Sequence, residues 1–92
     1  YRIELEEIEL ALCSCASIVE AAVIYEKKSE TAGEIISFVS SEAEKDLSLI
    51  RKQIENILPS YMLPRRFIWK HELPKNSNGK IDRKKLREEI QG

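Results

Sequence analysis

The residue types that mark a metal centre or a disulfide scaffold are scarce in this chain. It has one histidine, His71, and two cysteines, Cys13 and Cys15. The cysteines stand two apart inside a helical pattern, where their side chains diverge, so we expect free thiols that are buried or half-buried and no disulfide. Because there is no second cysteine pair, the ligand spacing of a structural zinc site is absent, and we expect no metal.

Long apolar runs are missing as well. No stretch approaches the roughly 18 apolar residues that a membrane-spanning helix needs. The first residues also lack the charged and apolar regions of a secretory signal. We therefore expect a soluble, cytoplasmic protein with no membrane partner.

What is present indicates one small domain with an uneven charge. The 92 residues are 42% hydrophobic and 34% charged, which favours one modest core with little room for a self-contained pocket. Residues 1–46 carry 4 basic and 11 acidic groups (net −7), and residues 47–92 carry 11 and 5 (net +6), which sum to −1. Either the C-terminal half faces an anion, or the halves neutralise each other across the surface.

The apolar pattern of the first half predicts an extended piece at 1–4, a helix and a hairpin. The helix spans 5–15, and its buried stripe comprises Leu5, Ile8, Leu12 and Cys15. Two segments rich in β-branched residues, 19–26 and 34–40, flank a polar loop that contains Gly33. This pattern predicts two antiparallel strands.

A second helix is predicted to follow the hairpin. Ser41 and Glu44 match a capping box, and Asp46 is a later alternative start. Pro59 ends the helix, whose apolar face comprises Leu47, Ile50, Ile54 and Ile57.

A third strand and a last helix complete the predicted fold. The strand covers 66–72, with Trp69 as a core or edge anchor, and Asp82 is the N-cap of the helix. Ile81 and Leu86 stand at the two positions of a hydrophobic staple. We expect an α+β fold with a small three-stranded, mainly antiparallel sheet and helices packed on it as one layer pair.

The segment LPKNSNGKIDR at residues 73–83 holds one lysine, Lys80, in a turn-rich loop. Proline, glycine, asparagine and serine favour turns, so we expect an ordered surface loop that can aim the cation at an anion. It is not a phosphate-binding P-loop, because Pro74 and Ile81 replace the glycine and the hydroxyl residue of that motif. The basic residues that follow (Arg83, Lys84, Lys85 and Arg87) lack interleaved aromatics and favour a solvated helix face over nucleic-acid binding.

Three segments resemble the last conserved motifs of the adenylate-forming ligase superfamily, which includes nonribosomal peptide synthetase adenylation domains, D-alanine carrier protein ligases and acyl-CoA synthetases. They are YRIELEEIE at 1–9, LPSYMLP at 58–64 and NGKIDR at 78–83. Their order and spacing match over essentially the whole chain. The resemblance implies that residues 1–92 form a single C-terminal subdomain, a mobile lid on a larger ATP-binding N-terminal subdomain that this sequence does not contain.

The resemblance also implies roles for individual residues. Lys80 is the expected catalytic lysine of acyl-adenylate formation, and Asn78, Gly79 and Asp82 shape its loop. Lys75 and Arg83 are secondary candidates for anion contact, although a solvated surface charge is the favoured interpretation for each. Arg2, Glu4 and Glu7 are candidates for lining the channel of the thiol acceptor after the lid rotates. The implied cofactors are Mg-ATP, bound mainly by the absent subdomain, and a phosphopantetheine thiol of a carrier protein or coenzyme A. The fragment alone is expected to be inactive.

Other interpretations stay open at this stage. The acceptor is a carrier protein, as the motif wording of amino-acid-activating members favours, or coenzyme A, as in an acyl-CoA synthetase. From another class, the chain is a non-catalytic module whose basic half binds an acidic protein or nucleic acid, or a regulatory domain that tolerates loss of Lys80. Acetylation of Lys80 is a further hypothesis, because it would neutralise the cation.

Overall fold

The computed structural model describes residues 4–15, 18–27, 29–30, 32–43 and 46–91. Their order is helix α1 (Leu5–Cys13), strands β1 (Glu20–Lys27) and β2 (Gly33–Ser40), helix α2 (Leu47–Glu55), a short 3-10 turn η1 (Ser60–Met62), strand β3 (Arg66–Lys70) and helix α3 (Arg83–Gln91). None of the described helices is long and apolar enough to cross a membrane.

The three strands form one mixed sheet in the order β1-β2-β3. β1 and β2 pair antiparallel over eight residue pairs, and β2 and β3 pair parallel over five. The α+β class and the mainly antiparallel three-stranded sheet are therefore confirmed. The parallel pair has a simple cause, because α2 and η1 lie between β2 and β3 and form the crossover that parallel strands require.

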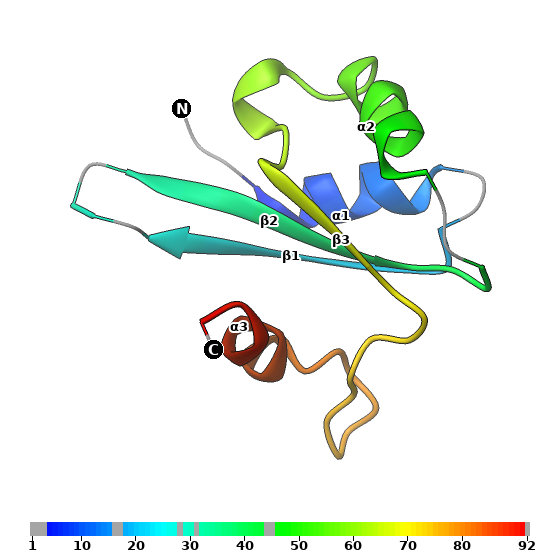
Figure 1. Ribbon diagram of the computed structural model, residues 1–92, viewed down its shortest axis with the longest axis vertical. Coiled ribbons are helices and arrows are strands. Elements are labelled where there is room, and N and C mark those ends of the chain that lie inside the picture. The colour runs from blue at the N-terminus through cyan, green and yellow to red at the C-terminus, as the bar shows by residue number, and fades with distance from the viewer. Residues whose placement is uncertain (1–3, 16–17, 28, 31, 44–45, 92) are drawn as a thin grey trace.

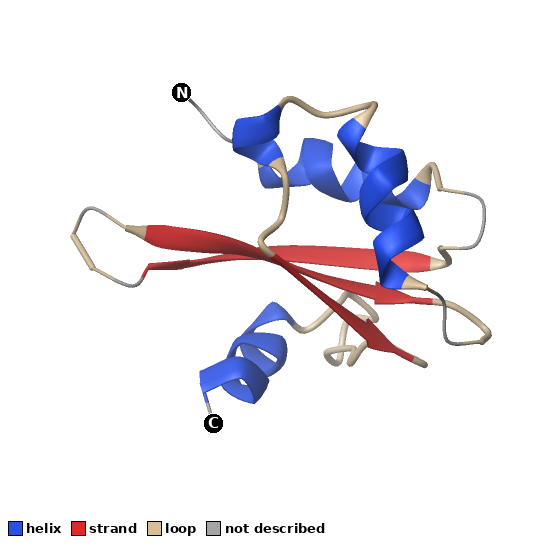
Figure 2. Ribbon diagram, turned by 45° about the horizontal axis from the view of Figure 1, so that its top comes forward, coloured by secondary structure: helices blue, strands red, loops and turns tan. Residues whose placement is uncertain are grey.

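Helices cover both faces of the sheet. α1 and α2 lie on one face and α3 lies on the other, as Figures 1 and 2 show. The expectation of a single helical layer was therefore wrong. The side chains of β1 alternate accordingly: Ala21 and Val23 join the core beneath α1 and α2, and Ala22 and Ile24 join the core beneath α3. A strand buried on both faces reads as a continuous apolar run, as β1 does.

The helix boundaries differ from the predicted ones at several ends. The stripe of α1 is confirmed, with Ile8, Leu12 and Cys15 buried and Leu5 packed against them, although the helix itself ends at Cys13. Cys13 is exposed, so its expected burial was wrong, while both thiols are free as predicted. Partial loss of solvent around each sulfur raises the pKa of both thiols, although Cys13 as a whole residue is exposed, and the neighbouring carboxylate of Glu9 raises the pKa of Cys13 further.

α2 does not begin at the predicted capping box of Ser41 and Glu44. The hydroxyl of Ser41 donates to the carbonyl of Ala43, and Glu44 lies outside the described residues. Asp46 is the N-cap instead, and its Oδ1 accepts a hydrogen bond from the backbone N–H of Ser48 at 3.0 Å. This is the later start that the sequence left open. The Ser48 hydroxyl also donates to this Oδ1, at 2.6 Å, and the hydroxyl and backbone hydrogen bonds from Ser48 together lower the pKa of the Asp46 carboxyl.

The ends of α2 and β3 are also shorter than predicted. α2 stops at Glu55, and Ile57, expected on its buried face, is 54% exposed, because the chain tightens into a turn in which the N–H of Asn56 bonds Gln53. β3 ends at Lys70, so exposed His71 does not continue its alternation. Trp69 is the anchor that was predicted: it packs against the core beneath α1 and α2, and its Nε1 donates to Ser41 Oγ at 2.8 Å.

Candidate functional site: the lysine hairpin

Residues 74–82 form a small β-hairpin, called here the lysine hairpin. At its base, the N–H of Asp82 donates to the carbonyl of Pro74 at 2.8 Å, and Lys75 and Ile81 form an antiparallel bridge. Near its tip, the N–H of Asn76 donates to the carbonyl of Lys80 at 2.8 Å. The segment lies between β3 and α3 and projects from the body of the domain as the orange loop in Figure 1.

The tip of the hairpin is a tight turn. The N–H of Gly79 donates to the carbonyl of Asn76 at 3.0 Å, and Gly79 has φ 79°. A three-residue hairpin loop that ends in a left-handed residue is a common geometry, and it favours glycine at that position because a Cβ would be strained there.

Asn76 organises this turn, and the sequence prediction missed it. Its Oδ1 accepts hydrogen bonds from the N–H groups of Asn78, at 2.9 Å, and of Lys80, at 3.1 Å. Asparagine often bonds the backbone two residues ahead, so its place before the SNG run was the available signal. Asn78, which was predicted to shape the loop, contributes its backbone N–H to this arrangement.

The base of the hairpin is rooted in the core beneath α3. Leu73, just before it, is 1% exposed, and half-buried Ile81 and buried Leu86 pack in the same cluster, which is the arrangement of the predicted staple. Asp82 caps α3, because its Oδ1 accepts from the N–H of Lys85 at 3.0 Å. The cap and the staple together fix the direction in which the hairpin leaves the sheet.

Lys80 itself is exposed at the end of the hairpin. Within the described part of the chain its ammonium forms no ion pair or side-chain hydrogen bond. Five hydrogen bonds fix the backbone of the hairpin, whereas no partner among the described residues holds the ammonium of Lys80. The arrangement can therefore present one positive charge to a negatively charged group outside this domain.

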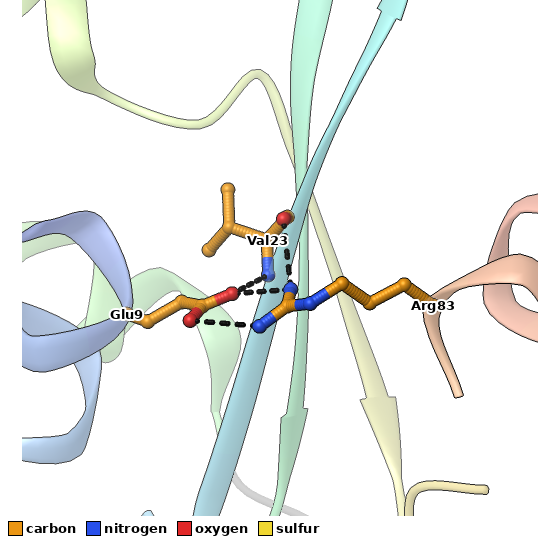
Figure 3. A network of polar contacts seen from close by, with 3 residues as sticks. All are labelled: Glu9, Val23 and Arg83. Atoms are coloured by element: carbon orange, nitrogen blue, oxygen red, sulfur yellow. Dashed lines mark hydrogen bonds and ion pairs between the residues drawn. The ribbon is translucent and has the colours of Figure 1, made fainter. Parts of the chain in front are cut away.

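The two secondary candidates for anion contact are engaged within the domain. Lys75 Nζ lies 2.6 Å from Glu20 Oε2, at the start of β1. Arg83 binds Glu9 of α1 through two contacts, Nη1 to Oε2 at 2.5 Å and Nη2 to Oε1 at 3.0 Å (Figure 3). Both cations are exposed, and each has a specific carboxylate partner within the domain that the sequence did not reveal.

The channel candidates lie at the start of α1. Glu4 is exposed, and its carbonyl accepts the N–H groups of Glu7 and Ile8 as the helix begins. Glu7 is exposed in the first turn, while Arg2 lies outside the described residues. Among the residues that the structure describes, no three His, Cys, Asp or Glu side chains gather as a metal site would require.

Residues 7–80 match the family described as AMP-binding enzyme C-terminal domain. Among curated relatives, zwittermicin A synthase ZmaJ of Bacillus cereus is 42% identical over 85 residues, which is 92% of this chain and 16% of that protein. The D-alanine–D-alanyl carrier protein ligase of Bacillus anthracis is 41% identical over 96 aligned residues, 98% of this chain and 19% of the ligase. The chain thus spans less than a fifth of the length of these relatives.

Solved structures have the same fold. A four-domain nonribosomal peptide synthetase, holo-AB3403 bound to AMP and glycine, superposes with a TM-score of 0.82 at 34% identity, over 91% of this chain and 6% of that one. The fatty acyl CoA synthetase of Mycobacterium tuberculosis superposes with a TM-score of 0.84 at 26% identity, over 97% of this chain and 18% of that one.

Proposed function

Because this chain belongs to the family of AMP-binding enzyme C-terminal domains, we propose that it is the mobile part of an AMP-forming ligase and supplies Lys80 for acyl-adenylate formation. The larger part of that enzyme would bind Mg-ATP and a carboxylic acid. The observation that carries the proposal is the exposed ammonium of Lys80, unpaired within the described ranges, on a hairpin whose backbone is hydrogen-bonded from base to tip.

The chemistry of the proposed reaction explains why a cation is needed. A carboxylate oxygen attacks the α-phosphate of ATP, a P–O bond forms, and the bond to pyrophosphate breaks. The attack brings like charges together, and a lysine between the carboxylate and the phosphate relieves their repulsion. At about 4 Å and an effective dielectric constant of about 20, one such charge pair contributes on the order of 4 kcal/mol.

The proposed acceptor of the second step is the phosphopantetheine thiol of a carrier protein, and the proposed substrate is an amino acid. The support is that the relative that is 41% identical is a D-alanine–D-alanyl carrier protein ligase, whereas the fatty acyl CoA synthetase is 26% identical. In this scheme the domain rotates after adenylation, so that Arg2, Glu4 and Glu7 line the thiol channel. Coenzyme A is the alternative acceptor. If the enzyme acylates coenzyme A but not a carrier protein, coenzyme A is the acceptor.

Substitution of Lys80 in the full-length enzyme tests the catalytic role. We expect Lys80→Ala to slow amino-acid-dependent ATP–pyrophosphate exchange by about a hundred- to thousandfold, the usual effect of removing a preorganised donor. Thiol loading from a supplied acyl-adenylate should be retained. The matched control is Lys84→Ala, which removes another exposed cation four residues away. Exchange at a near-normal rate in Lys80→Ala would exclude the assignment.

A further inference from the structure

Two ion pairs join the lysine hairpin and the residue that follows it to the first part of the chain. On the leg that enters the hairpin, Lys75 binds Glu20 at the start of β1. Just beyond the leg that leaves it, Arg83 binds Glu9 of α1. Arg83 lies three residues after Lys80, so this ion pair holds the chain at a point close to the lysine.

The Glu9–Arg83 pair is more than a surface ion pair. Glu9 Oε2 also accepts the N–H of Val23 at 2.8 Å, and Arg83 Nη1 also donates to the carbonyl of Val23 at 3.2 Å. Figure 3 shows the three residues closing a ring of contacts at the edge of β1. The Glu9 side chain is only 16% exposed. A two-contact arginine–carboxylate pair with further backbone bonds is more strongly oriented than a simple exposed pair.

The Glu9–Arg83 pair connects two helices that lie on different faces of the sheet. α1 and α3 lie on opposite faces of the sheet, and the pair reaches past the edge strand to join them (Figures 1 and 3). Arg87, one turn further along α3, also bonds this edge through the carbonyl of Tyr25 at 3.1 Å. Of these two arginines, Arg83 is the nearer to the hairpin in sequence.

We propose that Glu9 and Arg83 are positioning residues for Lys80, which hold the lysine hairpin in the orientation that adenylation requires. This inference rests on the proposed function of Lys80. Neither side chain touches the reacting atoms in this scheme. The pair keeps α1, β1 and the hairpin in one relative orientation, so that the ammonium of Lys80 approaches the nucleotide from a single direction.

Steady-state pyrophosphate exchange in the full-length enzyme tests the inference. Glu9→Gln keeps an acceptor for the N–H of Val23 but removes the charge that orients Arg83. We expect kcat to fall about tenfold with the KM for ATP unchanged, because a misplaced group loses transition-state contact while ground-state binding remains. In a Lys80→Ala background, Glu9→Gln should have no further effect, since the pair acts through that lysine.

A matched control is available on the same helix. Glu89 of α3 pairs with Lys70 of β3 at 2.5 Å, and this ion pair joins α3 to the sheet through neither Glu9 nor Arg83. Glu89→Gln should leave kcat within about twofold. An equal loss in Glu9→Gln and Glu89→Gln would overturn the inference, and so would the same loss from Glu9→Gln in both lysine backgrounds.

The failure of the inference is distinguishable from the failure of the proposed function. The proposed function fails if Lys80→Ala alone shows a near-normal rate of pyrophosphate exchange. If circular dichroism shows that Glu9→Gln is unfolded at the assay temperature, Arg83→Lys replaces it in the same kinetic comparison. The expected loss of kcat and the outcomes that overturn the inference are then the same. That variant keeps the positive charge but loses the two-contact geometry and the bond to the carbonyl of Val23.

Discussion

Replacing Gly79 by alanine should strain the turn that presents Lys80. Gly79 has φ 79°, and a Cβ added there would meet no heavy atom within 4 Å. The cost therefore comes from the backbone alone and not from a clash. An L-residue in the left-handed region costs about 1–2 kcal/mol relative to glycine. A free-energy change of that size shifts the ratio of closed to open hairpin by roughly 5- to 30-fold.

Amide hydrogen exchange measures this shift at the residue where it should occur. The N–H of Asn76, which bonds the carbonyl of Lys80 at 2.8 Å, should exchange about 5- to 30-fold faster in Gly79→Ala. Gly79→Asn is the matched control, because asparagine adopts this conformation more readily, and it should show a smaller increase. A D-alanine at position 79, introduced by semisynthesis, should leave protection unchanged. Equal protection in the glycine and L-alanine proteins would refute the reasoning.

Two further predictions concern stability. Leu86 is fully buried in the core at the base of the hairpin, so Leu86→Ala should lower the free energy of unfolding, measured by urea denaturation, by about 2–5 kcal/mol. The control is Leu10→Ala, at a side chain that is 71% exposed, which should change this free energy by less than about 0.5 kcal/mol. Asp46 has a lowered pKa in the folded state, so its contribution is present above its ordinary pKa near 4 and is lost as the pH falls through the lower folded value. The stability difference between the wild type and Asp46→Asn should therefore shrink on acidification through that window, and a difference independent of pH would contradict the assignment of the cap.

Features set by neighbours in the sequence could be predicted. The buried stripe of α1, the β1–β2 hairpin and the staple of Ile81 and Leu86 each depend on residues a few positions apart. Periodicity and turn chemistry report such short-range preferences directly. The same holds for Asp82, whose side chain caps the helix that begins at the next residue.

Features set by distant partners could not be predicted. The parallel placement of β3 and the position of α3 on the opposite face depend on how the chain packs as a whole. Lys75 and Arg83 were interpreted as surface cations because nothing near them in sequence reveals Glu20 or Glu9. Asn76 is a different case, because the turn that it stabilises is local. Asn76, Ser77 and Asn78 all precede Gly79, and the sequence does not show which of their side chains accepts the hydrogen bonds of the turn.

The contact between Glu9 and Arg83 spans 74 positions of the chain. Recombination that joins two members of this family at a crossover between these positions would take one partner from each parent, and a mismatch would remove the contact even if each part folded normally. Coupling of this kind is non-additive. Chimeric enzymes should accordingly be assembled with crossovers that precede α1, so that the whole domain is exchanged as one inherited unit.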